Sequence, residues 1–195
     1  MDIILPTRFN NPNLPVLVRP GFRDTFDRPA AATLGVTDDG KEWEYRYSPW
    51  SITEDGTATN GVTSQYAVVD GLTPNGTLTT VIAAAAVGDQ RFGVCLRRVD
   101  QGNYLWLGNN TSGTLTLYVV VGGSTANSTT VPGASLSTGD ELTAVMNGPT
   151  ITALLNGQQV RVFTAEEHQT ATHHGLFAFN SNGVAEWDSI EFTPA

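Results

Sequence analysis

Apolar and polar residues alternate with a period of two along residues 141–164, and this alternation predicts three short antiparallel strands. The runs are 141–147, 150–155 and 158–164, with Asn147-Gly148 and Asn156-Gly157 at the joins. An Asn-Gly pair supplies the positive φ angles that a type I′ hairpin turn needs. A helix would require apolar residues three or four positions apart, so a strand meander is favoured over a helix.

Similar strand-like runs, separated by turn residues, continue on both sides of this meander. About a dozen of them follow Phe22, which indicates an all-β sandwich or barrel. Residues 77–87 contain four alanines, which favour a helix, but the β-branched residues at their start predict a strand. For residues 165–174 we expect a short helix or a long loop. No long internal repeat is visible, which argues against a propeller or solenoid.

The composition agrees with a globular β-protein. Apolar residues make up 40% of the 195 residues and mean hydropathy is -0.12, so neither a disordered nor a membrane-inserted chain is expected. Only 15% of residues are charged, and Gly, Thr, Ser and Asn are abundant instead. The one cysteine, Cys95, cannot form an internal disulfide and is expected to be a buried strand residue.

The N-terminal residues differ from the rest of the chain. Half of the ten prolines lie within residues 1–29, and proline favours extended, irregular backbone. We therefore predict an extended Pro-rich arm over residues 1–21 and one sandwich domain over residues 22–195. A disordered tail is the alternative, but such tails seldom carry many apolar residues. The arm is expected to dock, on its own domain or on a neighbour, through Ile3, Ile4, Leu5, Phe9, Leu14, Val16, Leu17 and Val18.

The distribution of charge argues against nucleic acid as a partner, and the N-terminal residues argue against a membrane. Residues 1–28 hold four arginines and three aspartates and so have a net charge of +1. Since the whole chain has a net charge of -9, residues 29–195 have a net charge of -10. Such an acidic body repels phosphate backbones, and nucleic-acid binding is not expected. The N-terminus has no basic start and no long apolar run, so we expect neither a signal peptide nor membrane insertion.

Three stretches together resemble a known superfamily. They are DTFDRP followed by DDGKEWE and SPWSI within residues 24–52, FGVCLRRVDQGNYLWLGNNTSGTLTLYVV at residues 92–120, and GLFAFNSNGVAEWDSIEF at residues 175–192. Their order is similar to the concanavalin A-like, laminin G-like jelly-roll modules of bacterial surface proteins and phage tail proteins, especially those of actinobacterial phages. The resemblance covers roughly residues 22–193. It implies two antiparallel sheets packed face to face, one of them concave.

The resemblance is specific for the fold and weak for function, because this superfamily contains lectins, glucanases and structural modules. With the arm, it leads us to expect a non-enzymatic structural protein on the exterior of a phage virion, as a minor tail or head-decoration component. The expected partners are other virion proteins in a homo-oligomeric or multi-copy assembly, together with a host cell-envelope glycan. A lectin-like carbohydrate-binding module and a glucanase-like glycoside hydrolase are the alternatives.

The hydrolase alternative depends on Glu186, Asp188 and Glu191. Their spacing matches the Glu-X-Asp-X-X-Glu motif of laminarinase-like glucanases, in which two carboxylates act as nucleophile and acid/base. Here the motif lies on the final strand, where the structural modules also end, and its apolar residues are expected to pack in the core. We therefore assign no catalytic residues.

No metal-ligand set is assigned either. The residues Glu166, Glu167, His168, His173 and His174 follow no known ligand spacing, and polar residues on a loop are usually only solvated. Modules of the resembling kind often bind calcium. Its candidate ligands here are the loop oxygens of Asp70, Asp100, Asn180 and Asp188, although no defined calcium loop is present.

The best candidates for sugar binding are Tyr104 and Trp106, with Arg97 on the paired strand. An aromatic ring stacks on the apolar face of a pyranose, and a guanidinium donates hydrogen bonds to hydroxyls. Leu105 and Leu107 have the opposite parity and can fill the core. The alternatives are that both aromatic residues are core or form a protein interface. Trp43, in a second aromatic set, is expected to be core.

Overall fold

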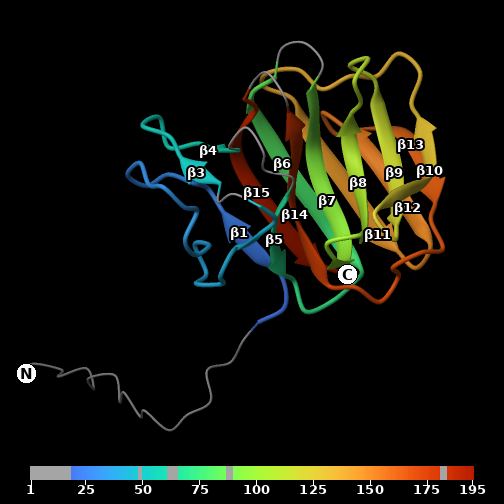
Figure 1. Cartoon of the computed structure of the whole chain (residues 1–195), viewed down its shortest axis with the longest axis horizontal. Coiled ribbons are helices and arrows are strands. Elements are labelled where there is room, and N and C mark those ends of the chain that lie inside the picture. Colours follow the sequence, from blue (N-terminus) through green and yellow to red (C-terminus); the bar gives the residue numbers. More distant parts are fainter. Residues whose placement is uncertain (1–18, 48–49, 61–65, 87–89, 181–183) are drawn as a thin grey trace, which may run out of the picture.

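The computed structural model describes residues 19–47, 50–60, 66–86, 90–180 and 184–195. In these residues all regular structure is β, in two antiparallel sheets that pack face to face as a sandwich (Figure 1). The expected jelly-roll fold class is therefore confirmed. No helix long and apolar enough to cross a membrane is found in the described ranges. The proposed docking residues of the arm, Ile3 to Val18, lie outside them, so the arm stays a prediction.

One sheet has eight strands. They are β1 (Phe22–Asp24), β3 (Ser51–Ile52), β4 (Ala58–Thr59), β6 (Gly76–Ala84), β11 (Glu141–Asn147), β12 (Thr150–Leu155), β13 (Gln158–Thr164) and β15 (Glu186–Pro194). Their order is β13-β12-β11-β6-β15-β4-β3, and β1 also pairs with β15. The final strand of the chain thus lies inside this sheet rather than at its edge.

The other sheet has seven strands. They are β2 (Glu44–Tyr45), β5 (Tyr66–Asp70), β7 (Gln90–Asp100), β8 (Asn103–Asn109), β9 (Leu115–Val121), β10 (Ser124–Thr130) and β14 (His173–Asn180). Their order is β10-β9-β8-β7-β14-β5-β2. Because β14 lies between β7 and β5, residues far apart in the sequence become neighbours on this sheet.

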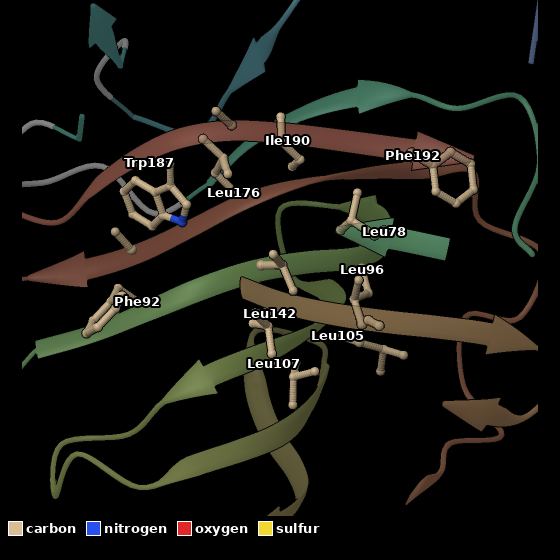
Figure 2. Packing of buried hydrophobic residues seen from close by; sticks show 14 of the residues in the cluster. Leu78, Phe92, Leu96, Leu105, Leu107, Leu142, Leu176, Trp187, Ile190 and Phe192 are labelled. Atoms are coloured by element: carbon tan, nitrogen blue, oxygen red, sulfur yellow. The ribbon is translucent and has the colours of Figure 1, made fainter. Parts of the chain in front are cut away.

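The core fills the space between the two sheets (Figure 2). From the seven-stranded sheet, β7 and β8 contribute Phe92, Leu105 and Leu107, all at most 1% exposed. From the other sheet, Trp187 is completely buried, and its ring lies 4.9 Å from that of Trp50. The parity expected for Leu105 and Leu107 is confirmed. Trp43 is also core, as predicted, at 5% exposure.

The predicted meander is present as β11, β12 and β13, but its first turn differs from the expectation. The second turn has positive φ at both Asn156 and Gly157, as type I′ requires. In the first, Asn147 pairs with Thr150, so the turn residues are Gly148 and Pro149. Gly148 has φ 53° and proline fixes a negative φ, which is the pattern of type II′. Proline at the second position cannot adopt the type I′ conformation.

Three further local expectations agree with the structure. The alanine-containing run forms strand β6 over Gly76–Ala84, as predicted. Residues 165–172 contain a turn and no helix, which agrees with the long-loop alternative. The strand position and burial expected for Cys95 are confirmed, since it lies on β7 and is completely buried.

Candidate glycan-binding face

The outer face of the seven-stranded sheet carries a second buried cluster, separate from the core. Residues of opposite parity to the core residues on β5, β7, β8, β9 and β14 point to this face. Its large members are Tyr66, Tyr104, Trp106, Tyr118 and Phe177. Sheet faces directed to solvent usually carry polar side chains, so an aromatic cluster on this outer face makes it a candidate binding surface.

Trp106 is the centre of this cluster. Its ring is stacked between those of Tyr118, at 4.2 Å and an interplanar angle of 5°, and Phe177, at 4.4 Å and 11°. Tyr118 lies on the neighbouring strand and pairs directly with Trp106. Phe177 lies two strands away, because β7 runs between β8 and β14.

Small residues on β7 allow the aromatic rings of β8 and β14 to meet across it. Phe177 pairs with Gly93, and Cys95 pairs with Trp106. A Cβ atom on Gly93 would overlap with the backbone carbonyl oxygen of Leu107, so only glycine fits at this position. Cys95 is completely buried beneath the cluster, which raises the pKa of its thiol and makes it unreactive.

The cluster continues toward β5 through Tyr104 and Tyr66. Their rings meet edge to face at 5.5 Å, and burial raises the pKa of Tyr104 to about 12. The Tyr66 hydroxyl accepts a hydrogen bond of 3.2 Å from Arg98 Nε. Arg98 also donates a hydrogen bond to Glu44 at 2.8 Å, and the two side chains form an ion pair at this end of the face.

A hollow of about 160 Å³ lies over the cluster. Tyr104, Trp106 and Phe177 line it on the sheet side, and Phe179 stands at its rim with 42% of its surface exposed. The Arg91 guanidinium lies 4.3 Å from the centre of the Phe179 ring, at cation–π distance. Arg91 is the only charged residue among the described residues that line this hollow. Gly123 of the β9–β10 turn and Thr125 of β10 add uncharged groups.

The structure brings together two of the three predicted sugar-binding residues. Tyr104 and Trp106 both lie on this outer face, but they are only 4% and 3% exposed, and both ring faces of Trp106 are covered. A pyranose therefore cannot stack on Trp106. The more accessible rings are those of Tyr118, which is half-buried, and Phe179. The sugar-binding role itself remains a prediction.

The placement of Arg97 beside these aromatics is wrong. Arg97 has φ 48° and lies where the pairing of β7 with β8 shifts register, so its side chain leaves the face. It is completely buried and donates to Pro74 O at 3.2 Å and to Asn75 Oδ1 at 3.0 Å. Arg91, six residues earlier, is the arginine that reaches the hollow.

Sequence reasoning missed Tyr118, Phe177, Phe179 and Arg91. The signal that could have found them is parity, because each has the opposite parity to a core residue of its own strand, such as Leu117 or Leu176. The pairing order that unites them was not visible in the sequence.

The glucanase-like motif lies on the other sheet, on β15. Trp187, Ile190 and Phe192 point into the core, as expected, while Glu186 accepts a hydrogen bond of 2.8 Å from Thr57 Oγ1. Glu191 lines a separate hollow on the outer side of the eight-stranded sheet. These carboxylates are thus separated from the aromatic cluster by the whole sandwich.

The histidines and the candidate calcium ligands are held by separate partners. His168 Nε2 lies 2.8 Å from Val120 O, and His173 contacts Glu44. Asp70 accepts from Thr172 Oγ1 at 2.6 Å, and Asp100 accepts from Asn103. In the part of the chain that the structure describes, no group of three or more His, Cys, Asp or Glu residues is arranged to hold a metal ion.

No protein-family model and no curated protein matches this sequence, but solved structures do. A β-glucanase of Bacillus licheniformis matches with a TM-score of 0.64 and 11% identity, covering 90% of this chain and 99% of that chain. The Crh5 transglycosylase matches with a TM-score of 0.61 and 14% identity, over 90% and 85% of the two chains. LamAcat from Zobellia galactanivorans matches at 0.56 and 12%, over 88% and 96%.

At these identities the likeness shows the shared fold, a concanavalin A-like jelly roll. It also corrects one expectation. The prediction that the chain is not an enzyme is contradicted, since the matching structures include a β-glucanase and a transglycosylase along nearly their whole length. That prediction relied on the position of Glu186 and Glu191 in the sequence. Their position argues against one candidate active site, but it does not exclude catalysis elsewhere in the protein. Nothing in these matches links the chain to a phage.

Proposed function

We propose that this protein acts on carbohydrate and binds a glycan in the hollow on the outer face of the seven-stranded sheet. The observation that carries the proposal is the row of stacked aromatic rings beneath a solvent-open hollow on a sheet face. Binding sites for small ligands combine aromatic and apolar side chains with a few polar groups, and Arg91 and Thr125 line this hollow beside the aromatic rings. The shared fold with a β-glucanase and a transglycosylase supports the same class of ligand.

The rings have two different tasks in this proposal. Trp106, clamped between Tyr118 and Phe177, is a rigid support. Tyr118 and Phe179 offer the contact surface, because each retains exposed area at the hollow. The apolar face of a pyranose ring would lie against these two side chains, and fixed rings lose little entropy on binding.

Arg91 supplies the polar contact. Its guanidinium is held over Phe179, and no ion pair engages it within the described residues. A guanidinium carries five N–H donors in a fixed plane, which suits two neighbouring sugar hydroxyls. We expect the affinity to depend on Arg91 as well as on the rings.

The test is calorimetry of the full chain against a panel of soluble β-glucan, chitin and bacterial envelope oligosaccharides. Tyr118→Ala and Arg91→Gln should each weaken binding by at least about tenfold, which is the loss of one stacking or charged hydrogen-bond contact. Glu191→Gln, in the hollow of the opposite sheet, is the matched control and should bind like the wild type. The absence of saturable binding, or equal loss in the control, would refute the proposal.

The same samples decide whether the bound glycan is also cleaved or transferred. The products are separated by size after incubation, and activity that is unchanged in both Glu186→Gln and Glu191→Gln removes the β15 carboxylates as a catalytic pair. Placement on the exterior of a phage particle, anchored by residues 1–21, is a further proposal. It is supported only by the sequence resemblance.

A further inference from the structure

Besides the three-residue β1, which pairs with β15 off the main strand order, the two sheets have four end strands, and these are not equally protected. Exposed edge strands present unpaired backbone groups, and proteins usually make them short or place charges on them. Two of the ends, β2 and β3, have only two residues each. The third, β13, carries the exposed charge of Arg161. The fourth, β10, has seven residues, Ser-Thr-Ala-Asn-Ser-Thr-Thr, with no charge and no proline.

The absence of charge extends well beyond β10. Between Asp100 and Asp140 the sequence contains no Asp, Glu, Lys, Arg or His, although 15% of the whole chain is charged. This stretch forms β8, β9, β10 and their connections. Strands β8, β9 and β10 therefore contribute no charged side chain to this end of the seven-stranded sheet, in a protein whose net charge is -9.

The opposite sheet does not cover strand β10. Six of its residues are exposed and only Thr129 is partly buried, so neither of its faces packs in the core. One side of its backbone pairs with β9, with a register shift between Thr125 and Asn127. No pairing of the other side occurs among the described residues. Figure 1 shows β10 at the outer margin of the molecule.

We infer that β10 pairs with β10 of a second copy of this chain, antiparallel, to join two seven-stranded sheets. Ser, Thr and Asn side chains both donate and accept hydrogen bonds. Across a twofold axis each β10 residue would therefore meet a neutral partner with which it can form a hydrogen bond, whether that partner is its own equivalent or another β10 residue. A charged residue would instead repel its equivalent. With a net charge of -9, two copies repel one another over most of their surface, and the neutral edge is where they approach at least cost.

Analytical ultracentrifugation of the full chain from about 1 µM to 1 mM tests this inference. We expect a concentration-dependent dimer. Ser128→Lys should raise the dissociation constant at least about tenfold, because it would place two positive charges close together in one interface. Gln159→Lys, which places the same charge on the other long edge, β13, is the matched control and should leave the dimer unchanged.

Crosslinking locates the interface independently. Single cysteines at each position from Thr125 to Thr129 are oxidised in the folded protein, because only the residue at the axis lies opposite its own equivalent. The buried Cys95 does not compete. At least one of the β10 positions should give a disulfide-linked dimer, and Gln159→Cys should not. The inference would be overturned if the chain stayed monomeric at 1 mM. It would also be overturned by a dimer that crosslinks through β13, or by a dimer whose dissociation constant is unchanged by Ser128→Lys. Glycan binding by the isolated monomer would remain unaffected.

Discussion

His174 makes the stability of the fold depend on pH in a way that can be calculated. The side chain is completely buried, beside the ring of Phe192 at 4.4 Å. Its Nδ1 accepts a hydrogen bond of 3.2 Å from the backbone N–H of Arg97, and its Nε2 lies 3.1 Å from the carbonyl oxygen of Thr73. The neutral ring with hydrogen on Nε2 satisfies both contacts. Protonation of Nδ1 would bring two donors together.

Burial is the main cause of the resulting pKa. It lowers the pKa of His174 from 6.5 to about 4, and the positive charges of Arg97 and His173 add to the effect, while Asp70 opposes it. Because the folded state binds this proton less readily than the unfolded state, the contribution is complete above pH 6.5. It is lost as the pH falls from 6.5 toward 4. The difference between the two pKa values corresponds to about 3 kcal/mol.

Urea unfolding at several pH values between 7.5 and 4 measures this contribution. His174→Gln keeps one donor and one acceptor but does not titrate, so subtracting its free energy of unfolding removes the effect of the carboxylates. We expect the advantage of the wild type over His174→Gln to shrink by about 3 kcal/mol across this range. The neighbouring His173→Gln should retain most of this pH dependence, because burial is the largest cause of the lowered pKa of His174 and the charge of His173 is a smaller one. A constant difference between wild type and His174→Gln would show that the ring is not buried in neutral form.

Two substitutions and one labelling experiment test other parts of the fold. Gly93→Ala should lower the free energy of unfolding by about 3 kcal/mol in urea titrations, since the alanine Cβ would overlap with the Leu107 backbone. A variant as stable as the wild type would exclude the close approach of β7 and β8. Cys95 should resist thiol reagents until the protein unfolds, because burial raises its pKa, and rapid labelling of native protein would contradict that burial. Gly157→Ala should lower the free energy of unfolding by about 1 kcal/mol, because Gly157 has φ 75° in the β12–β13 turn. An unchanged unfolding midpoint would argue against a type I′ turn.

Period-two patterns predicted the strands, and the resemblance predicted how they are layered. The side of the strand on which Leu105 and Leu107 lie followed from parity alone. Turn chemistry was less reliable where two signals overlapped. At residues 147–149 the Asn-Gly pair suggested one turn, but the proline after it moved the turn by one residue.

The candidate site was only partly predictable, for two physical reasons. First, Phe177 reaches Trp106 across β7, and this depends on the strand order β8-β7-β14, which alternation along a single strand does not encode. Second, the direction of a side chain follows from parity only while the strand is regular. Arg97 has a positive φ at a shift in register, so its side chain leaves the face that its position in the sequence implied.

The interior position of β15 has a consequence for how the protein is made. This last strand pairs with β1, β4 and β6, whereas the β11–β12–β13 meander is assembled from neighbouring segments. Local hairpins form quickly, but the eight-stranded sheet stays divided until β15 has been synthesised. A nascent chain lacking β15 exposes one side of β6 together with the core surface beneath Trp187. Deletion of the last ten residues should therefore yield an aggregating fragment rather than a smaller folded domain.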